Sequence, residues 1–183
     1  MHLWLSILYQ RGIYPPESFS RSEKYGLAMM VSNDNGLNQY LGQVLNQLQS
    51  WLLQGEVQKV VIVITGANSG ETLERWGFNV EMDKAVPRNG PSGKFKSERD
   101  IMSEIQAIIR QITASVTFLP LLQEPCTFDM LVYTDASADV PAAWEESDPR
   151  YIQNSTDVKL RSFTTKVHKV DSMVSYKNNE DDI

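Results

Sequence analysis

The residues of this chain that most suggest chemistry lie at 63–70, where Gly66 and Gly70 form a short glycine-rich turn after an apolar run. Glycines at such a turn let backbone amides approach a phosphate group, and a helix that begins there adds its positive dipole end. A dinucleotide-binding turn needs a third glycine two residues after Gly70, where this chain has Thr72. It also needs a helix next, whereas residues 75–82 alternate between polar and apolar types and predict a strand.

The stretch 63–70 nevertheless resembles the cofactor-binding turn of the short-chain dehydrogenases, which would imply a nicotinamide cofactor and an oxidoreductase. Members of that family also use a tyrosine followed four residues later by a lysine, and none of the 7 tyrosines has a lysine there. An NAD(P)-dependent dehydrogenase is therefore kept only as a competing interpretation. A rise in melting temperature with a nicotinamide cofactor would support it.

The other reactive side chains form no catalytic set. The single cysteine, Cys126, begins an apolar run, where a thiol is more often a small buried hydrophobe than a nucleophile. His168 lies beside Lys166 and Lys169 without a carboxylate partner, and His2 is far from it in the sequence. Zinc sites need several clustered Cys or His ligands. We therefore expect no enzyme activity, no metal and no cofactor.

The composition predicts one ordinary globular domain. The chain has 183 residues, of which 42% are hydrophobic, and a formal net charge of −6 that argues against a nucleic-acid partner. The apolar residues at 3–9 are too few to cross a membrane and lack the features of a signal peptide. We expect a soluble intracellular protein with one domain at 1–176, an acidic tail at 177–183 and protein partners.

Three segments have helical spacing. Residues 2–10 predict a helix that stops at Gly12, and the cap signal at 33–35 predicts a long helix that ends at Gly55. A third helix is expected from a cap at Ser97 to a stop at Pro120. The core-facing residues of the long helix are Leu37, Tyr40, Leu41, Val44, Leu45, Leu48, Trp51 and Leu52, and those of the third are Ile101, Ile105, Ile108, Ile112 and Val116.

Strands are expected between these helices and after them. Residues 57–65 predict a strand covered on both faces, residues 75–82 a half-buried strand that forms a hairpin with it, and residues 126–133 a strand apolar on both faces. We interpret 22–31 only as a short apolar piece and 84–95 as a solvent loop. The fold class is therefore α+β, with a mainly antiparallel sheet and long helices on one face.

The C-terminal run at 156–176 has a strand-like composition with an irregular phase. Its apolar residues change parity twice, from the even-numbered Val158 and Leu160 to Phe163 and Val167 and back to Val170, Val174 and Tyr176. Such a slip indicates either a bent edge strand with a bulge or two or three short strands whose pairing is weakly specified. The second interpretation predicts a mobile segment that can pair with the sheet in more than one way.

Four stretches together resemble one family. They are SILYQRGIYP at 6–15, LERW at 73–76, IRQITASVTFLPLL at 109–122 and LRSFTT at 160–165. In this order they closely resemble the spindle-checkpoint branch of the HORMA family, and the likeness runs from Ser6 to Tyr176. The resemblance implies a HORMA fold and a conformational switch. A C-terminal segment called the safety belt, here about 136–176, would cover the sheet edge in an open form and cross the sheet in a closed form that traps a partner's peptide.

The resemblance also assigns site residues. The peptide would pair with a strand made by Thr127, Phe128, Asp129, Met130, Leu131, Val132 and Tyr133. Residues of the belt would include Trp144, Leu160, Phe163, Val167, Val170, Val174 and Tyr176. Dimerisation is expected at Arg110, Gln111 and Phe118, and possible phosphorylation sites in the belt are Ser147, Ser155 and Ser172.

The partners that the resemblance implies are proteins. They are the activator of the anaphase-promoting complex, a coiled-coil kinetochore checkpoint scaffold, a second copy of the chain in an open-closed dimer, and an AAA+ remodelling ATPase with its HORMA-like adaptor. The expected locations are the nucleus, the kinetochore and the cytoplasm. The HORMA subunit of a translesion DNA polymerase and a rigid adaptor without a switch stay open as alternatives.

The chain departs from the family at its beginning. Family members have a strand and most of a helix before the stretch that starts at Ser6, whereas residues 1–5 would start inside that helix. We interpret this as a truncated isoform or a mis-called start. In the family that strand supports the open form, so we expect this chain to favour the closed form.

Overall fold

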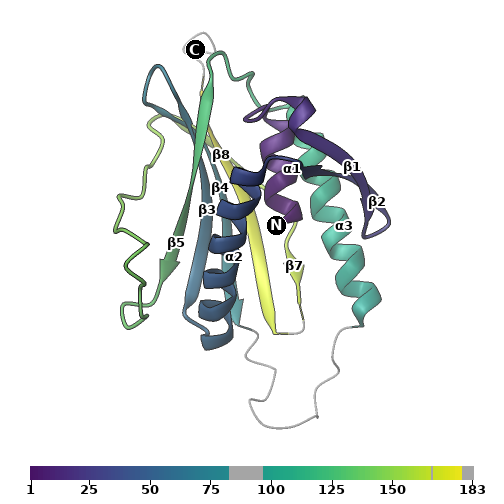
Figure 1. Ribbon diagram of the computed structural model, residues 1–183, viewed down its shortest axis with the longest axis vertical. Coiled ribbons are helices and arrows are strands. Elements are labelled where there is room, and N and C mark those ends of the chain that lie inside the picture. The colour runs from purple at the N-terminus through teal and green to yellow at the C-terminus, as the bar shows by residue number, and fades with distance from the viewer. Residues whose placement is uncertain (83–96, 166, 179–183) are drawn as a thin grey trace.

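The computed structural model describes residues 1–82, 97–165 and 167–178 (Figure 1). Helices α1 (His2–Gln10), α2 (Asn35–Gln54) and α3 (Glu98–Ala114) lie on one face of a six-stranded antiparallel sheet. The order of strands is β5 (Cys126–Thr134), β3 (Val57–Gly66), β4 (Thr72–Met82), β8 (His168–Lys177) and β6 (Ser155–Lys159), and β7 (Phe163–Thr164) pairs with β8.

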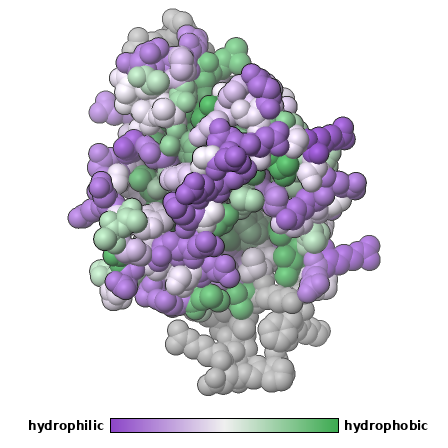
Figure 2. Space-filling model, viewed as in Figure 1, coloured by the Kyte–Doolittle hydropathy of each residue, from purple (hydrophilic) through white to green (hydrophobic). Residues whose placement is uncertain are grey.

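This architecture is the α+β class that the sequence predicts. Hydrophilic side chains cover much of the helix-bearing side, with smaller hydrophobic areas between the helices (Figure 2). Strand β8 extends to Lys177, one residue past the expected end of the domain. The solvent loop expected at 84–95 and most of the acidic tail lie outside the described residues.

Helix α2 begins and ends where the sequence predicts. The Asp34 side chain accepts a hydrogen bond of 2.7 Å from the Leu37 amide, and Gly55 ends the helix in the left-handed conformation at φ 75°. One expected core residue differs, because Tyr40 is 39% exposed. Tyr40 lies at the margin of the core-facing side of α2, where its ring contacts Phe128 of β5. The buried residues are Leu37, Leu41, Val44, Leu48 and Trp51.

Helix α3 begins at the expected cap but stops earlier than predicted. The Ser97 hydroxyl oxygen accepts a hydrogen bond of 3.1 Å from the Asp100 amide. After Ala114 the chain tightens into the 3-10 turn η2 (Ser115–Thr117), which changes the angular spacing of the side chains. Val116, expected in the core, is consequently 40% exposed, while Leu119 is buried.

A separate hairpin was not predicted. The 3-10 turn η1 (Pro16–Ser18) leads into β1 (Phe19–Lys24), which pairs with β2 (Leu27–Ser32). The apolar piece at 22–31 therefore contains the end of β1, the turn and most of β2. The turn between them has φ 55° at Tyr25 and 65° at Gly26. Two positive φ angles are typical of a type I′ turn, and a tyrosine at the first position hides that signal.

Strands β3 and β4 form the predicted hairpin, and β3 is buried on both faces. Its even-numbered residues Val60, Ile62 and Ile64 belong to the main core with the helices. Val61 and Val63 lie on the opposite, outer face and are 0% exposed. The segment 135–154, which follows β5, runs beside the sheet and crosses this outer face before β6 (Figure 1).

The C-terminal run forms three separate strands, as the second interpretation of its phase predicts, while its ability to pair in more than one way stays a prediction. Strand β6 keeps even-numbered Val158 toward the core, the break at 160–162 shifts the phase at Phe163, and the turn that begins at Thr165 restores it in β8. Val167 lies in that turn and is 41% exposed. The two parity changes therefore mark the two breaks between strands.

Candidate functional site

The glycine-rich turn at 66–70 connects β3 to β4 and opens no helix. The carboxylate of Glu124 accepts hydrogen bonds from the backbone amides of Asn68, at 2.8 Å, and Ser69, at 3.0 Å, and from the Ser69 hydroxyl. These hydrogen bonds lower the pKa of Glu124. The amides that a phosphate would need therefore already hold an anion of the chain itself, which argues against a nucleotide site here.

Cys126 begins β5 and His168 begins β8, and these two strands are not neighbours in the sheet. Burial raises the pKa of the Cys126 thiol, which disfavours the reactive thiolate. The Nε2 atom of His168 is buried without a hydrogen-bond partner among the described residues. Within the described part of the chain, no group of three His, Cys, Asp or Glu side chains is arranged to hold a metal ion.

Strand β5 contains all seven residues expected to pair with a peptide. It pairs with β3 along one edge, and no described strand pairs with its other edge. Phe128, Met130 and Val132 pack toward the helices, whereas Asp129 lies on the outer face where it meets Arg150. A free edge presents backbone amides and carbonyls that can add another strand.

A groove of about 720 Å³ lies along this free edge, between α2, β5 and the segment at 141–150. Tyr40 of α2 borders it and meets the ring of Phe128 edge to face, with 5.7 Å between ring centroids. Burial and the charge of Asp129 raise the pKa of Tyr40, and a backbone hydrogen bond from Met130 opposes them.

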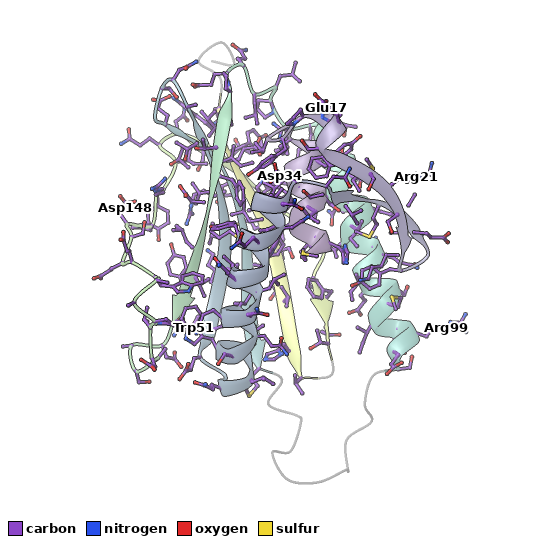
Figure 3. All side chains as sticks on the ribbon, in the orientation of Figure 1. Glu17, Arg21, Asp34, Trp51, Arg99 and Asp148 are labelled. Carbon is purple, nitrogen blue, oxygen red and sulfur yellow. The ribbon has the colours of Figure 1, made fainter. Side chains whose placement is uncertain are left out.

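Trp51 of α2 anchors the start of the segment at 135–154. Its indole Nε1 donates a hydrogen bond of 3.0 Å to the carbonyl of Asp139, and its ring meets that of Trp144 edge to face at 5.0 Å. Figure 3 labels Trp51 on α2, with Asp148 on the segment across β5 from it. Trp51 is a core residue, as expected, and it also attaches the segment that encloses the groove.

The expected belt residues fall mostly at the far edge of the sheet. Strand β8 pairs with β4, and β6 pairs with β8, at the edge opposite β5. Leu160, Val170 and Val174 are buried in the core. Trp144, Phe163 and Tyr176 pack against the core as partly buried residues, and Val167 alone of the seven expected residues is exposed.

Of the expected dimerisation residues, Arg110 and Gln111 lie near the end of α3 and Phe118 follows the 3-10 turn η2, and their surroundings differ. Arg110 is exposed and Phe118 is 42% exposed. The side-chain oxygen of Gln111 instead accepts a hydrogen bond of 2.5 Å from the amide of Arg161. Gln111 therefore connects α3 to the segment between β6 and β7.

The sequence did not single out Glu104, which lies on α3 two turns before Gln111. Its Oε2 atom accepts a hydrogen bond of 2.7 Å from the Thr164 amide and one of 3.0 Å from the Thr164 hydroxyl. Because glutamate is common on helices, the sequence gives no sign that Glu104 has a special role. Its role depends on where the C-terminal run lies in the fold. Together, Glu104 and Gln111 hold the chain from 161 to 164 against α3.

The three serines named as phosphorylation sites have different environments. Ser147 and Ser155 are exposed. Ser172 is 1% exposed in β8, and its hydroxyl has no hydrogen-bond partner among the described residues. A phosphate on Ser172 would not fit this arrangement of β8, because a buried dianion needs charged partners.

Comparison with known proteins places the chain in a family. The model of the HORMA domain family matches residues 3–168. The mitotic spindle assembly checkpoint protein MAD2A of Dictyostelium discoideum is 60% identical over 176 residues, which cover 96% of this chain and 86% of that protein. Human MAD2A is 55% identical over 172 residues, covering 94% and 83% respectively.

The fold agrees with this relationship. A chain in the crystal structure of the Mitotic Checkpoint Complex superposes with a TM-score of 0.88 and 46% identity, over 97% of this chain and 93% of that chain. No helix in the described part of this chain is long and apolar enough to span a membrane. The chain belongs to the HORMA-domain family and, within it, to the MAD2 spindle assembly checkpoint proteins.

Proposed function

We propose that this chain captures a short peptide of a partner as an additional strand on β5, beneath the segment at 135–154. The observation that carries the proposal is the unpaired outer edge of β5, which borders a groove of about 720 Å³ closed by that segment. Backbone hydrogen bonds to the edge would supply affinity, and side chains of the groove would supply selectivity.

We infer that the arrangement of the last strands corresponds to the closed form that the family resemblance implies. In the open form the C-terminal strands would cover the β5 edge, whereas here β8 lies on β4 at the opposite edge. The two breaks in the run from β6 to β8 give the segment short units that can pair differently in the two forms. Phosphorylation of the buried Ser172 would disfavour the closed form.

The captured peptides would come from the activator of the anaphase-promoting complex and from a coiled-coil kinetochore scaffold. Their capture would delay anaphase. A second copy of the chain would bind at Arg110, Gln111 and Phe118, and an AAA+ ATPase with a HORMA-like adaptor would reopen the closed form. The chain would act in the nucleus, at the kinetochore and in the cytoplasm, and it would perform no catalysis.

Synthetic peptides copied from the binding motif of the activator test strand addition. In an added strand, alternate backbone amides point toward β5. Methylating those amides one at a time should weaken binding by about 1–3 kcal/mol each, while methylating the amides between them should have little effect. Calorimetric titration of each peptide measures this pattern, with a scrambled peptide as the control.

The same titrations can contradict the proposal. Equal losses at every methylated position, or equal binding of the scrambled peptide, would show that the peptide does not add to the sheet. Association should also be slower than about 10⁵ M⁻¹s⁻¹, the lower end of the usual range for protein association, because the segment at 135–154 must first move. A rigid adaptor would show no such delay.

A further inference from the structure

We propose that two consecutive residues, Arg150 and Tyr151, attach the segment at 135–154 to the outer face of the sheet and control how fast a captured peptide is released. This inference rests on the proposed function, because it concerns the release of the same peptide. The two side chains contact opposite ends of a single row of residues that are paired across three neighbouring strands.

That row is fixed by the register of the sheet. Val63 of β3 pairs with Asp129 of β5 on one side and with Arg75 of β4 on the other. All three side chains therefore stand on the same face, which is the outer one. Arg150 contacts Asp129 at one end of the row, and Tyr151 covers Arg75 at the other end.

The contact of Arg150 is an ion pair to the strand that borders the groove. Its Nη1 lies 2.8 Å from Oδ2 of Asp129, and the two side chains are 37% and 50% exposed. Arg150 has a left-handed backbone at φ 46°, which is unfavourable for a residue with a side chain. The Asp148 carboxylate accepts a hydrogen bond of 2.7 Å from the Arg150 amide and stabilises this conformation.

The ring of Tyr151 packs against the buried cation of Arg75. Arg75 is only 7% exposed, yet no described carboxylate forms an ion pair with it, and its Nε has no hydrogen-bond partner among the described residues. Its Nη2 donates a hydrogen bond of 3.3 Å to the hydroxyl of Tyr133, and its guanidinium carbon lies 4.7 Å from the ring centre of Tyr151. The negative face of that ring therefore supplies attraction that a carboxylate would otherwise provide.

Both contacts must break before a peptide can leave sideways from the groove. Arg150 itself lines the groove, and the segment that carries it closes the side opposite α2. An exposed ion pair alone stabilises little. Because the two attachments lie on adjacent residues, each holds the other in place, so losing either should speed release.

Release rates measure this role directly. The full chain is loaded with a fluorescent synthetic peptide copied from the activator motif, and dissociation is followed after adding excess unlabelled peptide. Arg150→Ala and Tyr151→Ala should each release the peptide about threefold to tenfold faster, and the double variant faster still. Tyr151 is 71% exposed, so its removal should lower the free energy of unfolding, measured in urea, only by the small contribution of an exposed cation–π contact.

Three further variants separate attachment from general damage. Tyr151→Phe keeps the aromatic face and should release the peptide at the wild-type rate. Asp129→Arg combined with Arg150→Asp restores an ion pair and should be slower to release than Arg150→Ala. Arg21→Ala removes an exposed arginine in β1, on the other side of the molecule (Figure 3), and should change nothing.

The possible outcomes are distinguishable. If the wild-type chain does not take up the peptide, the proposed function and this inference both fail. If it binds the peptide but Arg150→Ala and Tyr151→Ala release it at the wild-type rate, only this inference is overturned. Equal acceleration by Tyr151→Phe and Tyr151→Ala would also overturn it, because the ring face would then not be the attachment.

Discussion

At the scale of single residues, Arg11 and Glu74 form a buried ion pair that joins the end of α1 to β4. The Arg11 Nε donates a hydrogen bond of 2.8 Å to the Glu74 carboxylate, which also accepts one of 3.1 Å from the Trp76 indole. Their side chains are 5% and 2% exposed. Burial raises the pKa of Glu74, and the positive charge of Arg11 opposes that rise.

Removing one partner of this pair should be costly. Glu74→Ala leaves the Arg11 charge buried without compensation, so we expect a loss of about 3–5 kcal/mol in the free energy of unfolding. Urea unfolding of both chains measures it. Glu71→Ala, which removes a carboxylate from the exposed pair with Lys177, is the matched control and should cost about 0–1 kcal/mol. Similar losses in the two variants would contradict this interpretation.

The Glu124 carboxylate makes the stability of the turn at 66–70 depend on pH. Because its pKa is lowered in the folded chain, its stabilisation is fully present above the unfolded pKa of glutamate and is lost as pH falls through the lower folded value. The NMR shifts of the Asn68 and Ser69 amides should therefore titrate with a midpoint below that of an ordinary glutamate. Glu124→Gln should abolish this titration, and a normal midpoint would refute the contact.

At the scale of elements, α3 holds the C-terminal run in place. Residues seven apart lie on the same face of a helix, and Glu104 and Gln111 use that spacing to accept hydrogen bonds from Thr164 and Arg161. These contacts exist only when β7 lies beside α3. They therefore belong to the arrangement in which β8 pairs with β4.

Loss of Glu104 should loosen β7 selectively. Glu104→Ala removes two hydrogen bonds to a carboxylate, and we expect a loss of about 1.5–3 kcal/mol in the stability of this arrangement. Amide hydrogen exchange should accelerate at Phe163 and Thr164 more than in β3. The control is Arg99→Ala, an exposed change at the start of the same helix (Figure 3). Unchanged exchange in Glu104→Ala would show that Glu104 of α3 does not hold β7 in place.

The elements that could be predicted from sequence have local signals. The Asp34 cap and Gly55 stop define α2, because each is determined by neighbouring residues. The alternation of 75–82 predicts the strand β4 but not its burial, since β4 begins at Thr72 and residues 74–78 are buried on both faces rather than half-buried. The hairpin of β1 and β2 was missed because its turn places Tyr25 at a position where asparagine or glycine is usual. The early end of α3 depends on the hydrogen bond of 2.6 Å from the Ser115 hydroxyl to the Ile112 carbonyl, which no periodicity reveals.

At the scale of the whole molecule, the segment at 135–154 connects the two edges of the sheet. It leaves β5, contacts Asp129 and Arg75 on either side of Val63 on the outer face, enters β6 at the far edge, and borders the groove. The sequence predicted a β3 strand covered on both faces, but not which segment covers the second face. Arg150 and Tyr151 lie in a polar stretch, and their partners Asp129 and Arg75 are distant in the chain.

Amide hydrogen exchange shows whether the free edge of β5 receives the peptide. Exchange along the whole chain is compared with and without the synthetic activator peptide at saturation. The amides of β5 that point away from β3 and those of 135–154 should become protected, while amides of β8 paired with β4 should not change. A peptide that binds tightly yet leaves the β5 amides exchanging at their original rate would contradict capture at this edge.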